Sequence, residues 1–370
     1  MGLAHFARSF EENVNRRGIV KRRAQGWLPE LIPYTGYGST TQVRVLARAL
    51  MTDPETANQS FTLPFLPRST HTYTPHALNE LTSHAEEAAA RAQRGWRQFF
   101  TTQVGFLKCT VKIGEKTIEA RTDRSGYIDL VVENHGLAPG WHDVEIIPIV
   151  GDAVKAPVMI VSPDATTGLV SDIDDTIVVT WLPRMFLAAW NSFVKHTNTR
   201  QPVPGMADFY RELLKDTPSA PVFYLSTGAW NTYSTLLNFM QLHEYPVGPM
   251  LMTDWGPTPT SVFRSGQEHK KTELRNLLVM FPNIKWYLVG DDGQHDPLIY
   301  DELARDHPSR VKAIMLRQLN VVEQVLSHGA PDAQEAQRED SDIEDDGIVV
   351  IRGKDGNALA QAARRIGLIK

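Results

Sequence analysis

The chain has a single cysteine, Cys109, in 370 residues, and it contains no Cys-x-x-Cys pair. Neither a disulfide within this sequence nor a cysteine-based zinc site can therefore form. Long apolar runs are also lacking, because the longest, such as residues 185–190, fall far short of the about 20 residues that span a bilayer. The first residues show no signal-peptide pattern and no myristoylation motif. We therefore expect a cytoplasmic protein without a transmembrane segment, able to lie at a membrane only peripherally.

An excess of positive charge is lacking as well. Lys and Arg number 38 against 43 Asp and Glu, which gives a net charge of −5 at pH 7. This balance disfavours nucleic acid as a partner of the whole chain. The hydrophobic fraction of 42% and the charged fraction of 22% are those of a globular protein. A chain of this length predicts two domains, and the oligomeric state stays open.

Residues 1–30 are locally basic, with apolar residues at helical spacing between Leu3 and Val14. We predict a basic amphipathic helix in this segment. Two roles stay open for it. The helix either packs on its own domain or contacts an anionic membrane, where basic residues meet lipid headgroups.

Residues 31–163 are mostly strand-like, with alternating stretches at 42–50, 107–113, 127–132 and 144–149. An Ala- and Glu-rich stretch at 77–100 interrupts them and predicts a helix. We therefore expect a mostly β, sandwich-like domain with a helical insertion.

The pattern changes after residue 163. Apolar strand candidates at 169–174, 221–226, 249–253, 285–290, 311–316 and 348–351 alternate with helical stretches. This alternation is typical of an α/β domain with a parallel sheet, which we assign to residues 164–330. Residues 332–346 hold eight acidic residues and one arginine, so we predict a flexible acidic linker over 331–346. A last strand and helix follow at 347–370.

Two aspartates, Asp172 and Asp174, follow an apolar strand in the string DIDDT. In a parallel α/β sheet, ligands bind beyond the carboxyl ends of the strands, so both side chains are expected at the mouth of a site. One carboxylate there can attack phosphorus, and the second can donate and accept protons. The pattern favours phosphoryl transfer to a carboxylate.

Three later segments carry matching chemistry. The strand at 221–226 runs into Ser226, Thr227 and Gly228, whose hydroxyl and main-chain donors suit a phosphoryl oxygen. The strand at 285–290 runs into Asp291, which with Asp172 offers the hard oxygen ligands that Mg²⁺ prefers. Lys270 or the adjacent Lys271 supplies a cation that can neutralise phosphoryl charge.

The ordered set D-x-D-x-T from Asp172 to Thr176, then Ser226, Lys270 and G-D-x4-D from Gly290 to Asp296 resembles the four motifs of the haloacid-dehalogenase superfamily. More narrowly, the strings DIDDT, GAW, HK and GDDGQHDPLIY are similar to those of the magnesium-dependent phosphatidate phosphatases typified by a fungal actin patch protein, relatives of the lipins. The resemblance covers about residues 165–325. It implies a haloacid-dehalogenase-like Rossmannoid sheet and hydrolysis of phosphatidate, a phospholipid substrate at a membrane surface.

The resemblance also implies roles for single residues. Asp172 would be the nucleophile and a Mg²⁺ ligand, Asp291 would complete the metal site, and Asp296 would orient it. Asp174 would give a main-chain carbonyl to the metal and serve as the acid and base. Ser226 and Lys270 would hold phosphoryl oxygens, and the family's HK pattern selects Lys270. Thr176, Thr227, Gly228 and Arg264 complete the predicted substrate-binding set.

The intervals between the motifs leave no room for a large cap domain. Only 43 residues separate Ser226 from Lys270, and they must supply a helix and the strand at 249–253. Asp292 departs from the family pattern, which has a small hydroxyl residue there more often. Two alternatives stay open beside the phosphatidate phosphatase. The same chemistry can act on another lipid or soluble phosphoester, or the chain can be a peripheral membrane-binding scaffold module.

Overall fold

A computed structural model describes residues 18–52, 102–179, 201–253, 266–293, 295–319 and 347–370, together with the backbone of 341–343. The helix predicted at 77–100, the first 17 residues and most of the acidic segment lie outside these described residues. The chain forms two compact units, and it passes from the first to the second between Pro163 and Asp164. Among the described residues, no helix is long and apolar enough to cross a bilayer.

The described part of the basic N-terminal segment is helical over residues 18–24. Gly26 then takes a φ of 84°, its N–H donates to the Arg23 carbonyl, and the Trp27 N–H donates to the Arg22 carbonyl. This pair of bonds is the Schellman arrangement, in which a left-handed glycine ends a helix. The chain then enters its first strand, which begins at Leu28.

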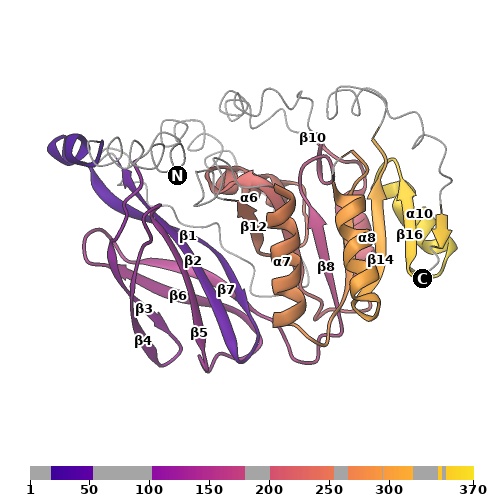
Figure 1. Cartoon of the computed structure of the whole chain (residues 1–370), viewed down its shortest axis with the longest axis horizontal. Helices are drawn as coiled ribbons and strands as arrows, with labels where there is room; N and C mark the ends of the chain where they lie inside the picture. The colour runs from indigo at the N-terminus through magenta and orange to yellow at the C-terminus, as the bar shows by residue number, and fades with distance from the viewer. Residues whose placement is uncertain are drawn as a thin grey trace, which may run out of the picture. The chain divides into compact units, whose positions relative to one another are not determined.

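The first unit is one seven-stranded sheet in the order β4-β3-β6-β7-β1-β2-β5 (Figure 1). All neighbouring strands are antiparallel except β1 and β7, which are parallel. The bounds are β1 Leu28–Gly38, β2 Gln42–Thr52, β3 Lys108–Ile113, β4 Lys116–Arg121, β5 Tyr127–Glu133, β6 Gly140–Pro148 and β7 Val154–Ile160. The expected mostly β domain is confirmed. Its described strands pair into one continuous sheet instead of the two that a sandwich has.

Apolar side chains on alternate positions make the core of this unit. β3 shows the pattern most clearly, since Cys109, Val111 and Ile113 are buried while Lys108 and Lys112 are exposed. The period of two places every second side chain on the same face of a strand. β1 was not predicted, because Pro29, Pro33 and two glycines break the alternation there. Gly38 is required in that strand, since a Cβ would lie 2.2 Å from the Gln42 carbonyl oxygen.

The second unit holds a seven-stranded sheet in the order β12-β11-β8-β13-β14-β16-β15. Every pair in it is parallel except β15 with β16, so the predicted parallel α/β sheet is confirmed. The bounds are β8 Thr167–Asp172, β11 Val222–Ala229, β12 Met250–Thr253, β13 Lys285–Asp291, β14 Val311–Arg317, β15 Ser341–Ile343 and β16 Val349–Gly353. A two-stranded pair, β9 Val178–Val179 and β10 Gln201–Pro202, follows β8 in the chain.

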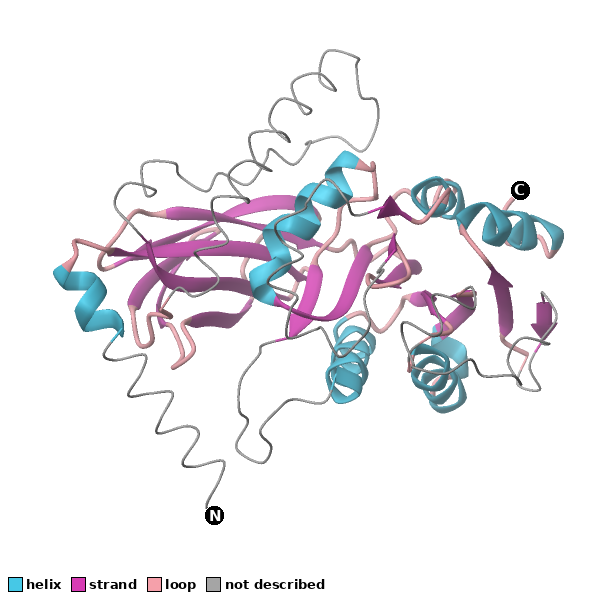
Figure 2. Cartoon of the chain, turned by 90° about the horizontal axis from the view of Figure 1, so that it is seen from above, coloured by secondary structure: helices cyan, strands magenta, loops and turns pink. Residues whose placement is uncertain are grey.

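Helices cover both faces of this sheet (Figure 2). Two of them, α7 Gly266–Met280 and α8 Asp296–Asp306, lie side by side on one face, and α5 Met206–Leu213 lies against α10 Gly356–Arg365 on the other. The second unit also contains α6, Tyr233–Leu242, and one-turn 3₁₀ segments at Trp230–Thr232 and Pro308–Arg310. Because both faces are covered, all six residues of β8 are buried, serine and aspartate included. This burial sets the electrostatics of the candidate site.

Candidate active site

Two central neighbouring strands each end in an aspartate. Asp172 is the last residue of β8, and Asp291 is the last residue of β13. The two strands run parallel, with Ser171 opposite Val289, so their ends meet at one edge of the sheet. This edge is where ligands bind in parallel α/β proteins.

Residues 173–178 form a tight loop after β8. The N–H groups of Ile177 and Val178 both donate to the Ile173 carbonyl, and Asp175 takes a φ of 59°. The loop returns Thr176 to the strand end, where its hydroxyl donates to Asp172 Oδ2 over 3.1 Å. The short spacing of DIDDT therefore brings a hydroxyl donor onto the first aspartate.

Lys270 projects from α7 into this edge and is almost fully buried. Its Nζ lies 2.6 Å from Asp172 Oδ1 and 2.5 Å from Asp296 Oδ1. Burial alone lowers the pKa of Lys270, but the charges of Asp172 and Asp296 outweigh it and hold the pKa above its ordinary value. Lys271 instead pairs with Glu302 of α8, and both side chains are partly exposed. The geometry separates the two adjacent lysines, and Lys270 is the one at the strand ends.

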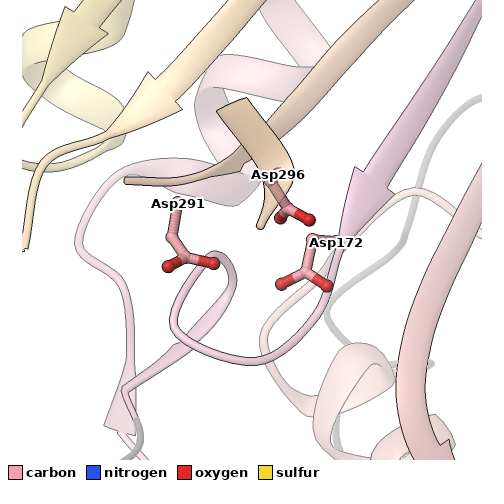
Figure 3. Close-up of side chains that lie close together, drawn as sticks. All are labelled: Asp172, Asp291 and Asp296. Atoms are coloured by element: carbon pink, nitrogen blue, oxygen red, sulfur yellow. The ribbon is translucent and has the colours of Figure 1, made fainter. Parts of the chain in front are cut away.

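Three carboxylates, those of Asp172, Asp291 and Asp296, converge at this edge (Figure 3). One oxygen from each lies within 4.8 Å of the others, and all three side chains are buried. Burial raises the pKa of Asp172 and of Asp291, and the neighbouring carboxylates add to this shift. Gly290 allows the close approach, because a Cβ there would lie 2.6 Å from Asp296 Oδ2.

The oxygens Asp291 Oδ2 and Asp296 Oδ2 are buried and have no hydrogen-bond partner in the part of the chain that is described. A buried carboxylate oxygen without a partner is costly, so such a pair points to a ligand that would satisfy it. Hard oxygen donors are the ligands that Mg²⁺ prefers. The donor set fits a divalent cation.

Asp174 does not join this cluster. Its Oδ2 accepts a hydrogen bond of 3.0 Å from the Ser226 hydroxyl, whose oxygen in turn accepts from the Gly228 N–H at 2.9 Å. The side chain is only partly buried, unlike that of Asp172. The structure thus brings the predicted proton donor next to the predicted phosphoryl-binding serine.

Of the remaining predicted site residues, the structure describes Thr227 and Gly228. Thr227 lies one residue beyond Ser226, and its carbonyl accepts from the Thr253 hydroxyl at 2.8 Å. Gly228 is placed by the contact to Ser226 given above. Arg264 lies outside the described residues.

Some residues around the loop were not predicted. Tyr210 on α5 bonds to the Ser171 hydroxyl at 2.7 Å, and the Tyr245 hydroxyl donates to the Ile177 carbonyl at 3.0 Å. Arg317, at the end of β14, donates to the Asp175 carbonyl. No local sequence pattern identifies Tyr210 or Tyr245 as residues near the site. Arg317 could have been identified, because an arginine at the end of an apolar strand is visible in the sequence.

Part of the second unit is similar to a known protein family. Residues 167–318 match the sequence model described as the catalytic domain of phosphatidate phosphatase APP1. This region is similar to the APP1 catalytic domain. Its range takes in the loop after β8, Ser226, Lys270 and both aspartates of the fourth motif.

Two curated proteins are similar over the same part of the chain. Phosphatidate phosphatase APP1 of Saccharomyces cerevisiae is 30% identical over 151 residues, which is 40% of this chain and 25% of that protein. An uncharacterized protein of Schizosaccharomyces pombe is 26% identical over 153 residues, 40% of this chain and 24% of that protein. The match thus spans about a quarter of each relative.

Among solved structures, a carbohydrate acetylesterase from Xanthomonas citri aligns over 60% of this chain and 67% of its own, at 9% identity and a TM-score of 0.22. A similarity this weak carries no argument about the fold or the function. The similarity to the APP1 catalytic domain therefore depends on the sequence match alone.

Proposed function

We propose that this protein is a magnesium-dependent phosphatidate phosphatase that releases diacylglycerol and phosphate through an aspartyl-phosphate intermediate. The observation that carries the proposal is a buried aspartate, Asp172, held by Lys270 and Thr176 at a strand end, two residues before an acid that contacts Ser226. All of these residues lie inside the region that matches the APP1 catalytic domain.

We assign the second unit to the haloacid-dehalogenase-like Rossmannoid fold. The order β12-β11-β8-β13-β14 supports this assignment, since it places the Asp172 strand between the strands that carry Ser226 and Asp291. Such an order brings three separate motifs to one edge of the sheet. The fold assignment and the four motifs are thus mutually consistent.

Asp172 is the nucleophile in this proposal. One of its carboxylate oxygens attacks phosphorus, and the bond from phosphorus to the ester oxygen breaks. Lys270 and Thr176 orient the carboxylate, since each donates to a different oxygen. The charge of Lys270 opposes the effect of burial, which favours the neutral acid.

Asp174 serves as the general acid and then as the base. Its carboxyl group donates a proton to the departing alkoxide of diacylglycerol. The resulting carboxylate then takes a proton from water, whose oxygen attacks the acyl phosphate and frees Asp172. The contact between Ser226 and Asp174 orients the acid for both steps.

Phosphoryl oxygens are held by donors already gathered at the edge. The Ser226 hydroxyl and the Lys270 ammonium are the main candidates, and the loop over Thr227 and Gly228 adds main-chain donors. Donors that face the developing charge stabilise the transition state more than the ground state.

Mg²⁺ would be held by the Asp172 and Asp291 carboxylates and the Asp174 carbonyl, with Asp296 orienting the site. When bound, the ion neutralises charge on the phosphoryl group. Asp296 also forms an ion pair with the Lys270 ammonium, which contacts Asp172 as well. In this arrangement Lys270 links the two carboxylates directly.

The substrate assignment is supported by the name of the similar yeast protein, a phosphatidate phosphatase. A phospholipid substrate places the reaction at a membrane surface, which the protein would approach peripherally from the cytoplasm. Phosphatidate as the substrate is a more specific claim than hydrolysis of a phosphomonoester, so it needs a test of its own.

The test is phosphate release from phosphatidate in mixed micelles, with Mg²⁺ or with a chelator. Wild type should release phosphate only with Mg²⁺, and Asp172→Asn should release none. Asp301→Asn should match wild type, because the Asp301 side chain on α8 is half-exposed and pairs with Arg305. If wild type cleaves an aryl phosphate but not phosphatidate, the lipid assignment is wrong and the chemistry stands. Silence of the wild type on both esters overturns the proposal.

A further inference from the structure

Arg317 is a buried arginine at the carboxyl end of β14, only 4% exposed. One terminal nitrogen donates to the Asp175 carbonyl at 2.7 Å, and Nε donates to the Lys354 carbonyl at 3.3 Å. A planar guanidinium has donors in several fixed directions, so it can hold two carbonyls at once. Arg317 therefore joins the loop after β8 to the chain that follows β16.

Arg317 contacts the loop at Asp175, a residue whose backbone conformation is unfavourable for any residue other than glycine. Asp175 has a φ of 59°, in the left-handed region that residues other than glycine rarely adopt. Its N–H donates to the Val178 carbonyl at 2.9 Å, and its carbonyl accepts from Arg317. Asp175 directly follows Asp174 and directly precedes Thr176, so its peptide groups set the positions of both.

The main chain of Arg317 supports the second acidic loop. Arg317 lies opposite Asp291 in the β13–β14 pair, and its carbonyl accepts from the Asp292 N–H at 2.9 Å. Asp292 Oδ1 in turn accepts from the Leu319 N–H at 2.8 Å. One residue thus contacts the loop that carries Asp172 and the loop that carries Asp291.

The last 24 residues take part in the same contact. Gly353 on β16 lies opposite Arg317, its carbonyl accepts from the Gln318 N–H at 2.9 Å, and Lys354 follows it. The segment 347–370 lies beyond the region 167–318 that matches the catalytic-domain family. It nevertheless supplies a strand of the sheet and a carbonyl, that of Lys354, to which the guanidinium donates.

We propose that Arg317 is a positioning residue that sets the loop of Asp172 and Asp174 relative to Asp291, and that the segment 347–370 is part of the catalytic unit through it. This inference rests on the proposed phosphatase function for its activity readout. It adds a residue that touches neither the substrate nor the reacting atoms.

The test compares Arg317→Lys with Arg310→Lys in the full chain. Arg310 is a matched control, since it lies just before β14 and donates to the carbonyls of Ile284, Leu278 and Phe281. A lysine keeps the charge, but its single ammonium group cannot donate to both carbonyls as the wider, planar guanidinium does. The readouts are kcat and KM on an aryl phosphate, and Mn²⁺ affinity by calorimetry without substrate.

We expect Arg317→Lys to lower kcat at least ten-fold, to change KM less than three-fold and to weaken Mn²⁺ binding at least ten-fold. Arg310→Lys should leave kcat and Mn²⁺ affinity within two-fold of wild type, even if its melting temperature falls as much as that of Arg317→Lys. If Arg317→Lys loses melting temperature alone, the inference is overturned. It is also overturned if neither Arg317→Lys nor Arg317→Gln shows a cooperative unfolding transition, since Arg317 would then serve folding itself.

Failure of the proposed function has a different signature. A wild type that cleaves neither phosphatidate nor aryl phosphate but binds Mn²⁺ removes that function alone. The change in Mn²⁺ affinity of Arg317→Lys then still decides the inference. A wild type that binds no Mn²⁺ overturns the inference, because no cation site would exist for Arg317 to organise.

Discussion

Lys270 Nζ on α7 lies 2.6 Å from Asp172 Oδ1 at the end of β8, and both side chains are at most 3% exposed. The same nitrogen also contacts Asp296. One buried cation thus faces a cluster of three buried carboxylates, and this imbalance determines how the site responds to mutation, pH and metal.

Removal of Lys270 should destabilise the second unit strongly. Breaking a buried ion pair by removing one partner costs about 3–5 kcal/mol, because the remaining charge is left buried. We expect Lys270→Met to lower the free energy of unfolding by roughly this amount at pH 7, measured by urea denaturation. The difference from wild type should shrink as the pH falls, because the pKa of Asp172 is raised and its protonated form no longer needs a cation. A difference that stays constant down to pH 4 would contradict this account.

Asp291→Asn should stabilise the metal-free protein. Burial raises the pKa of Asp291, so the folded state prefers the neutral acid and the ionised form costs stability. The cost appears as the pH rises above the unfolded pKa of about 3.9 and is complete above the folded pKa. In a chelator, the melting temperature of the variant should therefore exceed that of wild type at pH 8, and the gap should close toward pH 4.

Addition of Mg²⁺ should reverse that order. A cation that binds only the folded state stabilises it by about 2.7 kcal/mol at 100 times its Kd. Wild type should gain melting temperature with Mg²⁺, and Asp291→Asn should gain little. An equal gain in both proteins would place the cation elsewhere.

Ser226→Ala should lower activity without unfolding the chain. The change removes the hydroxyl that donates to Asp174 and accepts from Gly228, and with it one phosphoryl donor. Loss of a single such donor lowers kcat by about 10²-fold in other enzymes. Ser226→Thr keeps the hydroxyl and is the control, with kcat measured on an aryl phosphate. A kcat unchanged in Ser226→Ala would remove this serine from the site.

Cys109 offers a probe of the first unit alone. Its thiol is buried in β3, and burial raises its pKa to about 11. At pH 8 roughly one thiol in a thousand is then ionised, and the thiolate is the reactive form. We expect an aromatic disulfide reagent to label the folded chain very slowly, and to label it fully when urea unfolds the first unit. Fast labelling without urea would show that the strand opens.

Much of the second unit could be predicted from its residues. Strands buried on both faces read as continuous apolar runs, and an aspartate or serine at the end of such a run marks the ligand edge of a parallel sheet. Asp172, Ser226 and Asp291 were found in this way. The resemblance to a known family added Asp296 and the choice of Lys270, which the geometry now places beside each other.

The tertiary structure alone decided the rest. A lysine next to another lysine carries no sign of which one turns inward, and only the packing of α7 against the sheet sends Lys270 to Asp172 and Lys271 to Glu302. The pairing of β1 was also decided by the tertiary structure, because its prolines break the alternating pattern of a strand. So were the contacts of Arg317, whose partners lie 142 and 37 residues away in the chain. Sequence patterns report local periodicity and the chemistry at the ends of elements. Contacts between distant segments depend on how those elements pack, and these contacts set the charge balance and the loop geometry of the site.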